Sequence, residues 1–227
     1  MEKRRLSPKV QGVLALALLL LAVFGGAGRW DWVRGWIFVA EYVGGMGLAL
    51  VVLRRVNPGL IEARSNWRHT NTKGFDRIIL AIYLPMTYVQ PALAGIEVVR
   101  LDRPGMPEAA LYGGVLAFAA AIVLMGWVMA VNPFAEPTVR IQTEREHRVI
   151  RAGPYRFVRH PMYVGAILMH VAVALILGSY WALAAVGVIA VLLVLRTALE
   201  DRTLQRELSG YREFAAQTRW RLVPGIW

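Results

Sequence analysis

The hydrophobic pattern divides the chain into six long apolar segments separated by polar, basic connections. The segments are 10–28, 35–53, 78–99, 109–131, 162–178 and 180–199. A helix needs about 20 apolar residues to cross the hydrocarbon layer of a bilayer. The pattern therefore predicts an all-α fold, a polytopic membrane helix bundle of about six transmembrane helices. We divide it into a four-span part, 1–131, and a C-terminal part, 132–227, within one integrated domain.

Composition and charge support this prediction. Of the 227 residues, 57% are hydrophobic, which is too many for an ordinary soluble domain. The net charge of +11 is a feature of nucleic-acid-binding proteins too, but 22 of the 26 Lys and Arg residues lie in alternate connections and the two ends. By the positive-inside rule, such a distribution places both termini in the cytoplasm, where the basic residues would contact anionic membrane lipids. We predict a multi-pass membrane protein with no nucleic-acid partner.

The first apolar segment has two interpretations. Lys3, Arg4 and Arg5 precede it and small residues follow it, as in a signal peptide. We favour an uncleaved first span, because six spans keep both termini on the basic side; cleavage would leave five. The excess of Arg over Lys is typical of GC-rich bacterial genomes, which would place the protein in the plasma (inner) membrane.

The residues suited to metal binding are few. The chain has no Cys and only four His, without an HExxH motif. We predict no metal. His170, inside the fifth apolar segment, is expected to hydrogen-bond between helices. The third segment holds Pro85 and Pro91 and is either a kinked, cavity-lining helix or a bent packing helix.

The last two apolar segments are joined by about two residues around Ser179, which predicts a tight antiparallel helical hairpin. With a rise of about 1.5 Å per residue, His160 lies about 28 Å before the turn and Glu200 about 31 Å after it. Arg159 and His160 should therefore face Glu200 and Asp201 at one end of the hairpin. We expect the last helix to continue to about Leu208 and end before Gly210, followed by a tail that either lies on lipid headgroups or covers the hairpin mouth.

The stretch 147–165 resembles the membrane methyltransferases that include the isoprenylcysteine carboxyl methyltransferases and the phospholipid methyltransferases. The family pattern is similar to H-x-x-V-x-x-G-x-Y-x-x-x-R-H-P-x-Y-x-G, followed by a hydrophobic hairpin and an acidic pair. The matching residues are His147, Gly153, Tyr155, Arg159, His160, Pro161, Tyr163, Gly165, Glu200 and Asp201. The resemblance extends from Asn132 to the C-terminus, and Asp201 departs from it, since a second Glu is usual there.

The resemblance implies S-adenosyl-L-methionine as the cofactor, bound at the mouth of the hairpin by these ten residues, and a lipophilic acceptor that arrives from the bilayer. Glu200 and Asp201 would accept hydrogen bonds from the cofactor, and Arg159, His160 or the start of the helix would hold its carboxylate. Tyr155 and Tyr163 would contact the adenine.

Catalytic roles are expected for Arg140, His147, Arg159 and His160. Arg140, with Gln142, would orient an anionic acceptor. A carboxylate acceptor needs no base, whereas an amine or hydroxyl would need His147 or His160, each expected to have a pKa near neutrality.

Two other classes of function are weighed against methyl transfer. An NADPH-dependent membrane reductase of the sterol reductase type has a similar hairpin motif, but Met162 and Ala166 replace its Asn and its acid. A non-catalytic scaffold is disfavoured by the intact Arg159, His160 and Glu200. The acceptor stays open among a prenylcysteine carboxylate, a phospholipid amine and other lipid-soluble molecules. We predict no particular oligomeric state.

Overall fold

The computed structural model describes residues 8–65 and 69–227 and contains helices but no strand in these ranges. The basic residues Lys3, Arg4, Arg5 and Arg68, which entered the charge count above, lie outside them. The helices in chain order are α1 (Pro8–Leu20), η1 (Leu21–Gly25), α2 (Val33–Val56), α3 (Pro58–Ser65), α4 (Gly74–Gly95), η2 (Ile96–Arg100), α5 (Glu108–Val131), η3 (Thr143–Arg145), η4 (Gly153–Arg156), α6 (Pro161–Leu177), α7 (Tyr180–Glu207) and α8 (Tyr211–Gln217).

All six predicted apolar segments form helices, which confirms the all-α membrane bundle. Four are long and apolar enough to cross a bilayer, namely α2, α4 with η2, α5 and α7. The first and fifth segments form the shorter apolar helices Val10–Gly25 and Pro161–Leu177. The count of six spans therefore stays a prediction, while the assignment to an integral membrane protein holds on the four long helices.

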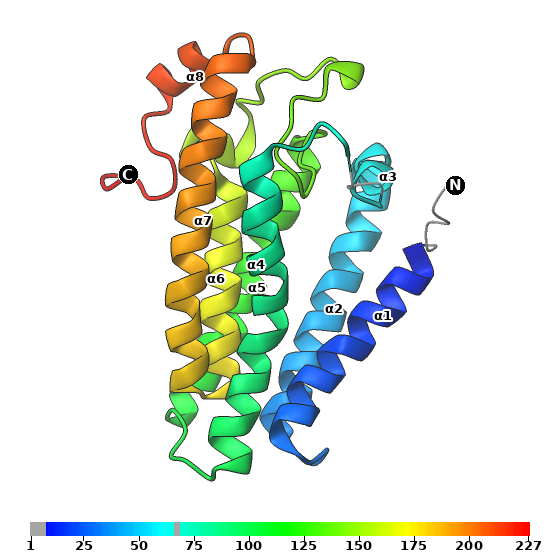
Figure 1. Cartoon of the computed structure of the whole chain (residues 1–227), viewed down its shortest axis with the longest axis vertical. Coiled ribbons are helices and arrows are strands. Elements are labelled where there is room, and N and C mark those ends of the chain that lie inside the picture. The colour runs from blue at the N-terminus through cyan, green and yellow to red at the C-terminus, as the bar shows by residue number, and fades with distance from the viewer. Residues whose placement is uncertain (1–7, 66–68) are drawn as a thin grey trace.

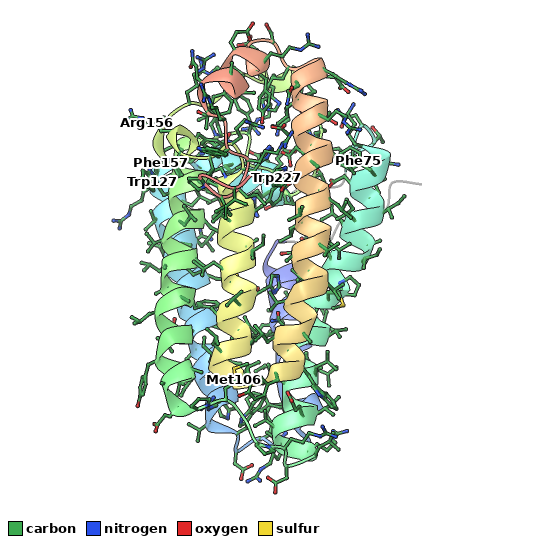
Figure 2. All side chains as sticks on the ribbon, turned by 90° about the vertical axis from the view of Figure 1, so that its left-hand side faces the viewer. Phe75, Met106, Trp127, Arg156, Phe157 and Trp227 are labelled. Atoms are coloured by element: carbon green, nitrogen blue, oxygen red, sulfur yellow. The ribbon has the colours of Figure 1, made fainter. Side chains whose placement is uncertain are left out.

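The long helices run along one axis, and α4, α5, α6 and α7 pack into a compact group (Figure 1). Helices α1 and α2 join this group at one end of the molecule and diverge from it toward the other. Side chains along the middle are almost entirely carbon, whereas nitrogen and oxygen atoms gather at the two ends (Figure 2). This distribution is what a bilayer around the middle of the bundle requires.

Small residues allow the helices to approach closely. A Cβ atom at Gly95 of α4 would lie 2.5 Å from the backbone nitrogen of Ala27, and one at Gly114 of α5 would lie 2.7 Å from the backbone nitrogen of Ile176. In lipid, close backbone packing of this kind is a main source of helix association. These contacts join the segment just after η1 to α4, and α5 to α6.

The predicted hairpin is formed by α6 and α7. Helix α6 begins at Pro161 and ends at Leu177, and the following Gly178 has a φ of 72°, the left-handed conformation common at helix ends. Ser179 then caps α7 by accepting a hydrogen bond from the Ala182 nitrogen at 2.9 Å. The buried Glu97 carboxylate accepts from the Ser179 hydroxyl and the Trp181 nitrogen. The turn is thus stabilised by its own Ser179 cap and by Glu97 of η2.

Helix α4 serves both of the roles considered for it. Leu80, Tyr83 and Leu84 line a cavity of about 290 Å³. The fully buried Gln90 donates to the carbonyl of His170 at 2.8 Å and shares a 2.7 Å hydrogen bond with its Nδ1 atom. His170 therefore hydrogen-bonds between helices, as expected.

Candidate functional site

The charged groups at the start of α6 and the end of α7 meet, as the span lengths predict. Arg159 binds Asp201 through two hydrogen bonds, Nε to Oδ1 at 2.7 Å and Nη2 to Oδ2 at 3.1 Å. His160 places Nε2 3.3 Å from the same carboxylate. Further donors to Asp201 are Tyr211, Gln205 and Arg221. Asp201 thus has five partners and a side chain that is only 1% exposed. It joins the start of α6, the end of α7 and the C-terminal segment in one buried hydrogen-bond network.

The C-terminal tail covers this mouth. Arg159 Nη1 donates to the carbonyls of Thr218 and Arg219 at 2.8 and 2.7 Å, and the backbone nitrogens of Arg159 and His160 donate to the carbonyls of Trp220 and Arg221. Figure 2 shows Trp227, the end of the tail, beside the polar end of the hairpin. The tail therefore covers the hairpin mouth, which was one of the two interpretations considered for it. It occupies the two backbone donors that directly precede α6.

A cavity of about 290 Å³ lies between the loop 132–150 and the helices of the hairpin. Its bundle side is apolar and includes Leu80, Met125, Ala166 and Leu193. Its loop side carries polar and aromatic groups. The predicted site residues that line it are Arg140, His147, Tyr155, Arg159, His160, Pro161, Tyr163 and Glu200. A polar wall opposite an apolar wall suits one polar ligand and one lipophilic ligand.

Glu200 lies on the hairpin side of the cavity and has spare hydrogen-bonding capacity. The Tyr163 hydroxyl donates to its Oε2 atom, and this is its only hydrogen bond among the residues that the structure describes. Arg196 lies one turn earlier on α7, with its guanidinium 5.3 Å from the centre of the Tyr163 ring. A carboxylate can accept about four hydrogen bonds, so Glu200 can bind further donors in the cavity.

His147 differs from its expected behaviour. Its ring lies 4.5 Å from that of Phe134, and its Nδ1 atom accepts a hydrogen bond from the Gln142 nitrogen at 3.4 Å. Burial, with the nearby Arg140 cation, lowers the pKa of His147 to about 4. The expectation of a pKa near neutrality was therefore wrong for this residue, because the sequence does not reveal burial beside a cation. His147 is neutral at physiological pH, with its proton on Nε2.

Arg140 is neutralised by acidic side chains of its own loop. It binds Glu136 through Nε at 2.8 Å and Nη2 at 2.9 Å, and Glu144 through Nη1 at 2.6 Å. Its side chain is 2% exposed and that of Glu136 is 1% exposed. Gln142 is also engaged, since it donates to the Phe134 carbonyl. Arg140 thus shapes the loop that forms one cavity wall.

Three of the predicted site residues do not line the cavity. Asp201 lies behind the wall that Arg159 and His160 form. Gly165 packs on α5, where an added Cβ atom would lie 2.6 Å from Met125 Cγ, and Gly153 has a φ of 60° beside Trp127. Trp127 lies next to the turn that carries Arg156 and Phe157 (Figure 2). The motif glycines in this structure serve close packing and a left-handed turn.

Sequence reasoning also missed the buried ion pair between Arg196 and Asp76, beside the cavity. Arg196 Nε donates to Asp76 at 2.7 Å, and Asp76 also accepts from the Val139 nitrogen at 2.8 Å. This pair joins α4, α7 and the loop. Arg64 of α3 also lines the cavity and donates to the Ala135 carbonyl. The only available signal was a single Arg at the end of an otherwise apolar run.

Residues 114–206 match the model of the isoprenylcysteine carboxyl methyltransferase (ICMT) family. No curated protein matches the chain. The matched segment begins in α5, before Asn132 where the resemblance was expected to begin, and it includes the loop and the hairpin. The family resemblance is confirmed over this segment, and it supports a membrane methyltransferase in general terms.

Proposed function

From this family match, we propose that the protein is an S-adenosyl-L-methionine-dependent methyltransferase whose cofactor and lipophilic acceptor meet in the 290 Å³ cavity. The observation that carries the proposal is Glu200, a carboxylate on the polar wall with one hydrogen-bond partner in the described part of the chain, opposite an apolar wall formed by α4, α5 and α6. The polar wall suits a water-soluble cofactor, and the apolar wall suits an acceptor from the bilayer.

The cavity offers groups that match the cofactor's chemistry. Glu200 would accept hydrogen bonds from ribose hydroxyls or from the amino group. Tyr155 and Tyr163 offer aromatic rings for the adenine, and Asn132 holds the Tyr155 hydroxyl at 2.5 Å. Arg159 and His160 adjoin the cavity with positive or hydrogen-bonding groups, although Arg159 is largely committed to Asp201.

The bound cofactor would supply an activated methyl group on a sulfonium. The chain itself would hold the acceptor in line with that group and exclude water, and positioning of this kind can account for a large share of a rate enhancement. A carboxylate acceptor requires nothing more, because no proton is lost.

An amine or hydroxyl acceptor would require a proton acceptor, and the geometry favours His160 over His147. The Nε2 atom of His160 lies 3.3 Å from Asp201, so a proton there is held by the carboxylate and Nδ1 is left to accept another. His147 already uses Nδ1 to accept from Gln142 and has a pKa of about 4. It is a poor base at neutral pH.

The decisive measurement is calorimetry on the detergent-purified protein with S-adenosylhomocysteine and, separately, NADPH. We expect S-adenosylhomocysteine to bind and Glu200→Gln to weaken that binding by about 1 to 3 kcal/mol, the range for a hydrogen bond to a charged group. Glu207→Gln is the matched control, because Glu207 lies on the same helix but pairs with Lys73 at the surface. Binding of NADPH alone would instead assign a reductase.

The acceptor class can be identified with membranes that contain the overproduced protein. Incubation with methyl-labelled cofactor, followed by organic extraction, separates labelled lipids or small molecules from labelled protein. We expect the label in the extractable fraction, in line with the apolar wall of the cavity. Label confined to protein would redirect the proposal to a protein-borne prenylcysteine.

A further inference from the structure

A second cavity of about 280 Å³ lies beside the main one, at the start of α4. It is lined by His69, Thr72, Arg77, Leu80, Ala81, Leu84 and Thr138. Leu80, Leu84 and Thr138 also line the main cavity, so the two cavities are neighbours across these side chains. None of the residues that distinguish the second cavity belongs to the segment matched by the methyltransferase family.

The second cavity contains polar atoms without partners. Three buried side-chain polar atoms lack a hydrogen-bond partner in the described ranges, and two of them, Thr72 Oγ1 and His69 Nε2, belong to residues that line this cavity. Thr72 is 7% exposed. His69 Nε2 lies 3.5 Å from Glu136, a long distance for a hydrogen bond, and Glu136 is already bound by Arg140 and Arg145. Unpartnered buried donors cost free energy that a ligand would recover.

The local charge favours an anionic ligand. Arg77 uses one nitrogen to donate to the Thr70 carbonyl at 2.5 Å, and no carboxylate pairs with it within the described part of the chain. The neighbouring charges Lys73 and Asp76 are paired with Glu207 and Arg196. A guanidinium, a hydroxyl and an imidazole around one cavity are the donors that bind phosphate oxygens.

The other wall of this cavity is apolar and continues onto the lipid-facing side of α4. Ala81 and Leu84 line the cavity, and Leu84 is 40% exposed. The adjoining Ile78 and Ile82 are 67% and 48% exposed on the same helix, which is a candidate span. A free anion would gain nothing from this surface, whereas an acyl chain would bury it.

We infer that the second cavity binds an anionic phospholipid, with the headgroup phosphate held by Thr72, His69 and Arg77 and an acyl chain along α4. The inference goes beyond methyl transfer and does not require it. A lipid held at this place would fill the space between α4 and the loop that carries Thr138, next to the main cavity.

The test is calorimetric titration of the delipidated, detergent-solubilised full chain with dioctanoyl phosphatidylglycerol, dioctanoyl phosphatidylcholine and inorganic phosphate. We expect phosphatidylglycerol to bind most tightly. Thr72→Val, which replaces a hydroxyl with a methyl group, should weaken it about fivefold to tenfold, and Arg77→Gln by at least as much. Equal affinity for inorganic phosphate would overturn the lipid assignment, as would equal affinity for phosphatidylcholine.

Matched controls exclude general effects. The control for Thr72→Val is Thr87→Val, which makes the same change on α4 at a hydroxyl that donates to the Leu84 carbonyl. The control for Arg77→Gln is Arg55→Gln, which removes an exposed charge at the end of α2. Both should bind phosphatidylglycerol like the original protein. If they weaken binding as much as Thr72→Val and Arg77→Gln, the interaction is nonspecific and the inference fails.

A thermal measurement separates binding from folding. Thr72 Oγ1 has no hydrogen-bond partner among residues 8–65 and 69–227. Lipid-free Thr72→Val should therefore melt at the same temperature as the original protein or higher, and only the increase in Tm upon phosphatidylglycerol addition should shrink. A lower Tm without lipid would show that the hydroxyl has a structural role, which contradicts the inference.

Discussion

At the scale of single residues, the site depends on which charged groups are already neutralised. Asp201, Arg159 and Arg140 all have buried partners, whereas Glu200 makes one hydrogen bond with the described residues and faces the cavity. A buried ion pair is costly to break, so its members do not exchange readily onto a ligand. Glu200 is therefore the residue whose mutation reports on the cofactor, and the others report on folding.

Arg159→Ala should destabilise the protein by about 3 to 5 kcal/mol, because it removes the bidentate partner of the buried Asp201 carboxylate. The measurement is the midpoint of denaturation in detergent, with Arg156→Ala, an exposed neighbour, as control. An Arg159→Ala protein of unchanged stability that fails to bind S-adenosylhomocysteine would instead show that Arg159 contacts the cofactor directly.

His147 should make the stability depend on pH. Its pKa is about 4 in the folded protein and about 6.5 in an unfolded chain. Between these values the unfolded chain binds more protons, so the free energy of unfolding falls as the pH drops from about 6.5 to 4, by up to about 3 kcal/mol. Melting curves across this range should show a smaller loss for His147→Gln. Identical pH profiles for both proteins would contradict the burial of a neutral His147.

At the scale of elements, the hairpin and its neighbour α5 form the frame of the site. Helix α6 is bound to α7 by the Gly178–Ser179 turn and to α5 through Gly114 and Gly165, where little space exists for a side chain. The two helices are thereby kept in the alignment that brings Arg159 to Asp201.

Neighbouring glycines of α5 provide a direct test of this packing. Gly114→Ala should lower the Tm, because its Cβ would lie 2.7 Å from the Ile176 nitrogen and force α5 away from α6. Gly113→Ala is the matched control: no atom lies within 4 Å of its Cβ position, and Ala favours a helix over Gly by up to about 1 kcal/mol. Equal effects of the two substitutions would contradict the close contact.

At the scale of the whole molecule, the polar segments gather at two ends and those that form the site share one end. The start of α1, the loop 132–160 and the C-terminal tail lie toward that end (Figure 1). These segments and the connection 54–77 carry most of the Lys and Arg residues of the sequence, which predicts that this end is cytoplasmic.

The absence of cysteine from the sequence makes this orientation testable. In intact cells, a membrane-impermeant maleimide should label Pro104→Cys, in the connection before α5, and should label Ser209→Cys, after α7, only once the membrane is permeabilised. The reverse pattern would invert the predicted topology, and labelling of both in intact cells would contradict an odd number of crossings between them.

The sequence alone determined the helices, the hairpin and the meeting of Arg159 and His160 with Asp201, because these follow from apolar run lengths and the constant rise of a helix. It also carried the family motif. It did not determine which polar groups would be left without a partner. The Glu136–Arg140 and Asp76–Arg196 pairs and the low pKa of His147 depend on how the loop folds back onto the helices, and so does Thr72, which has no hydrogen-bond partner among the described residues. Burial and choice of partner are properties of tertiary contacts, so only the structure decided which groups are left for ligands.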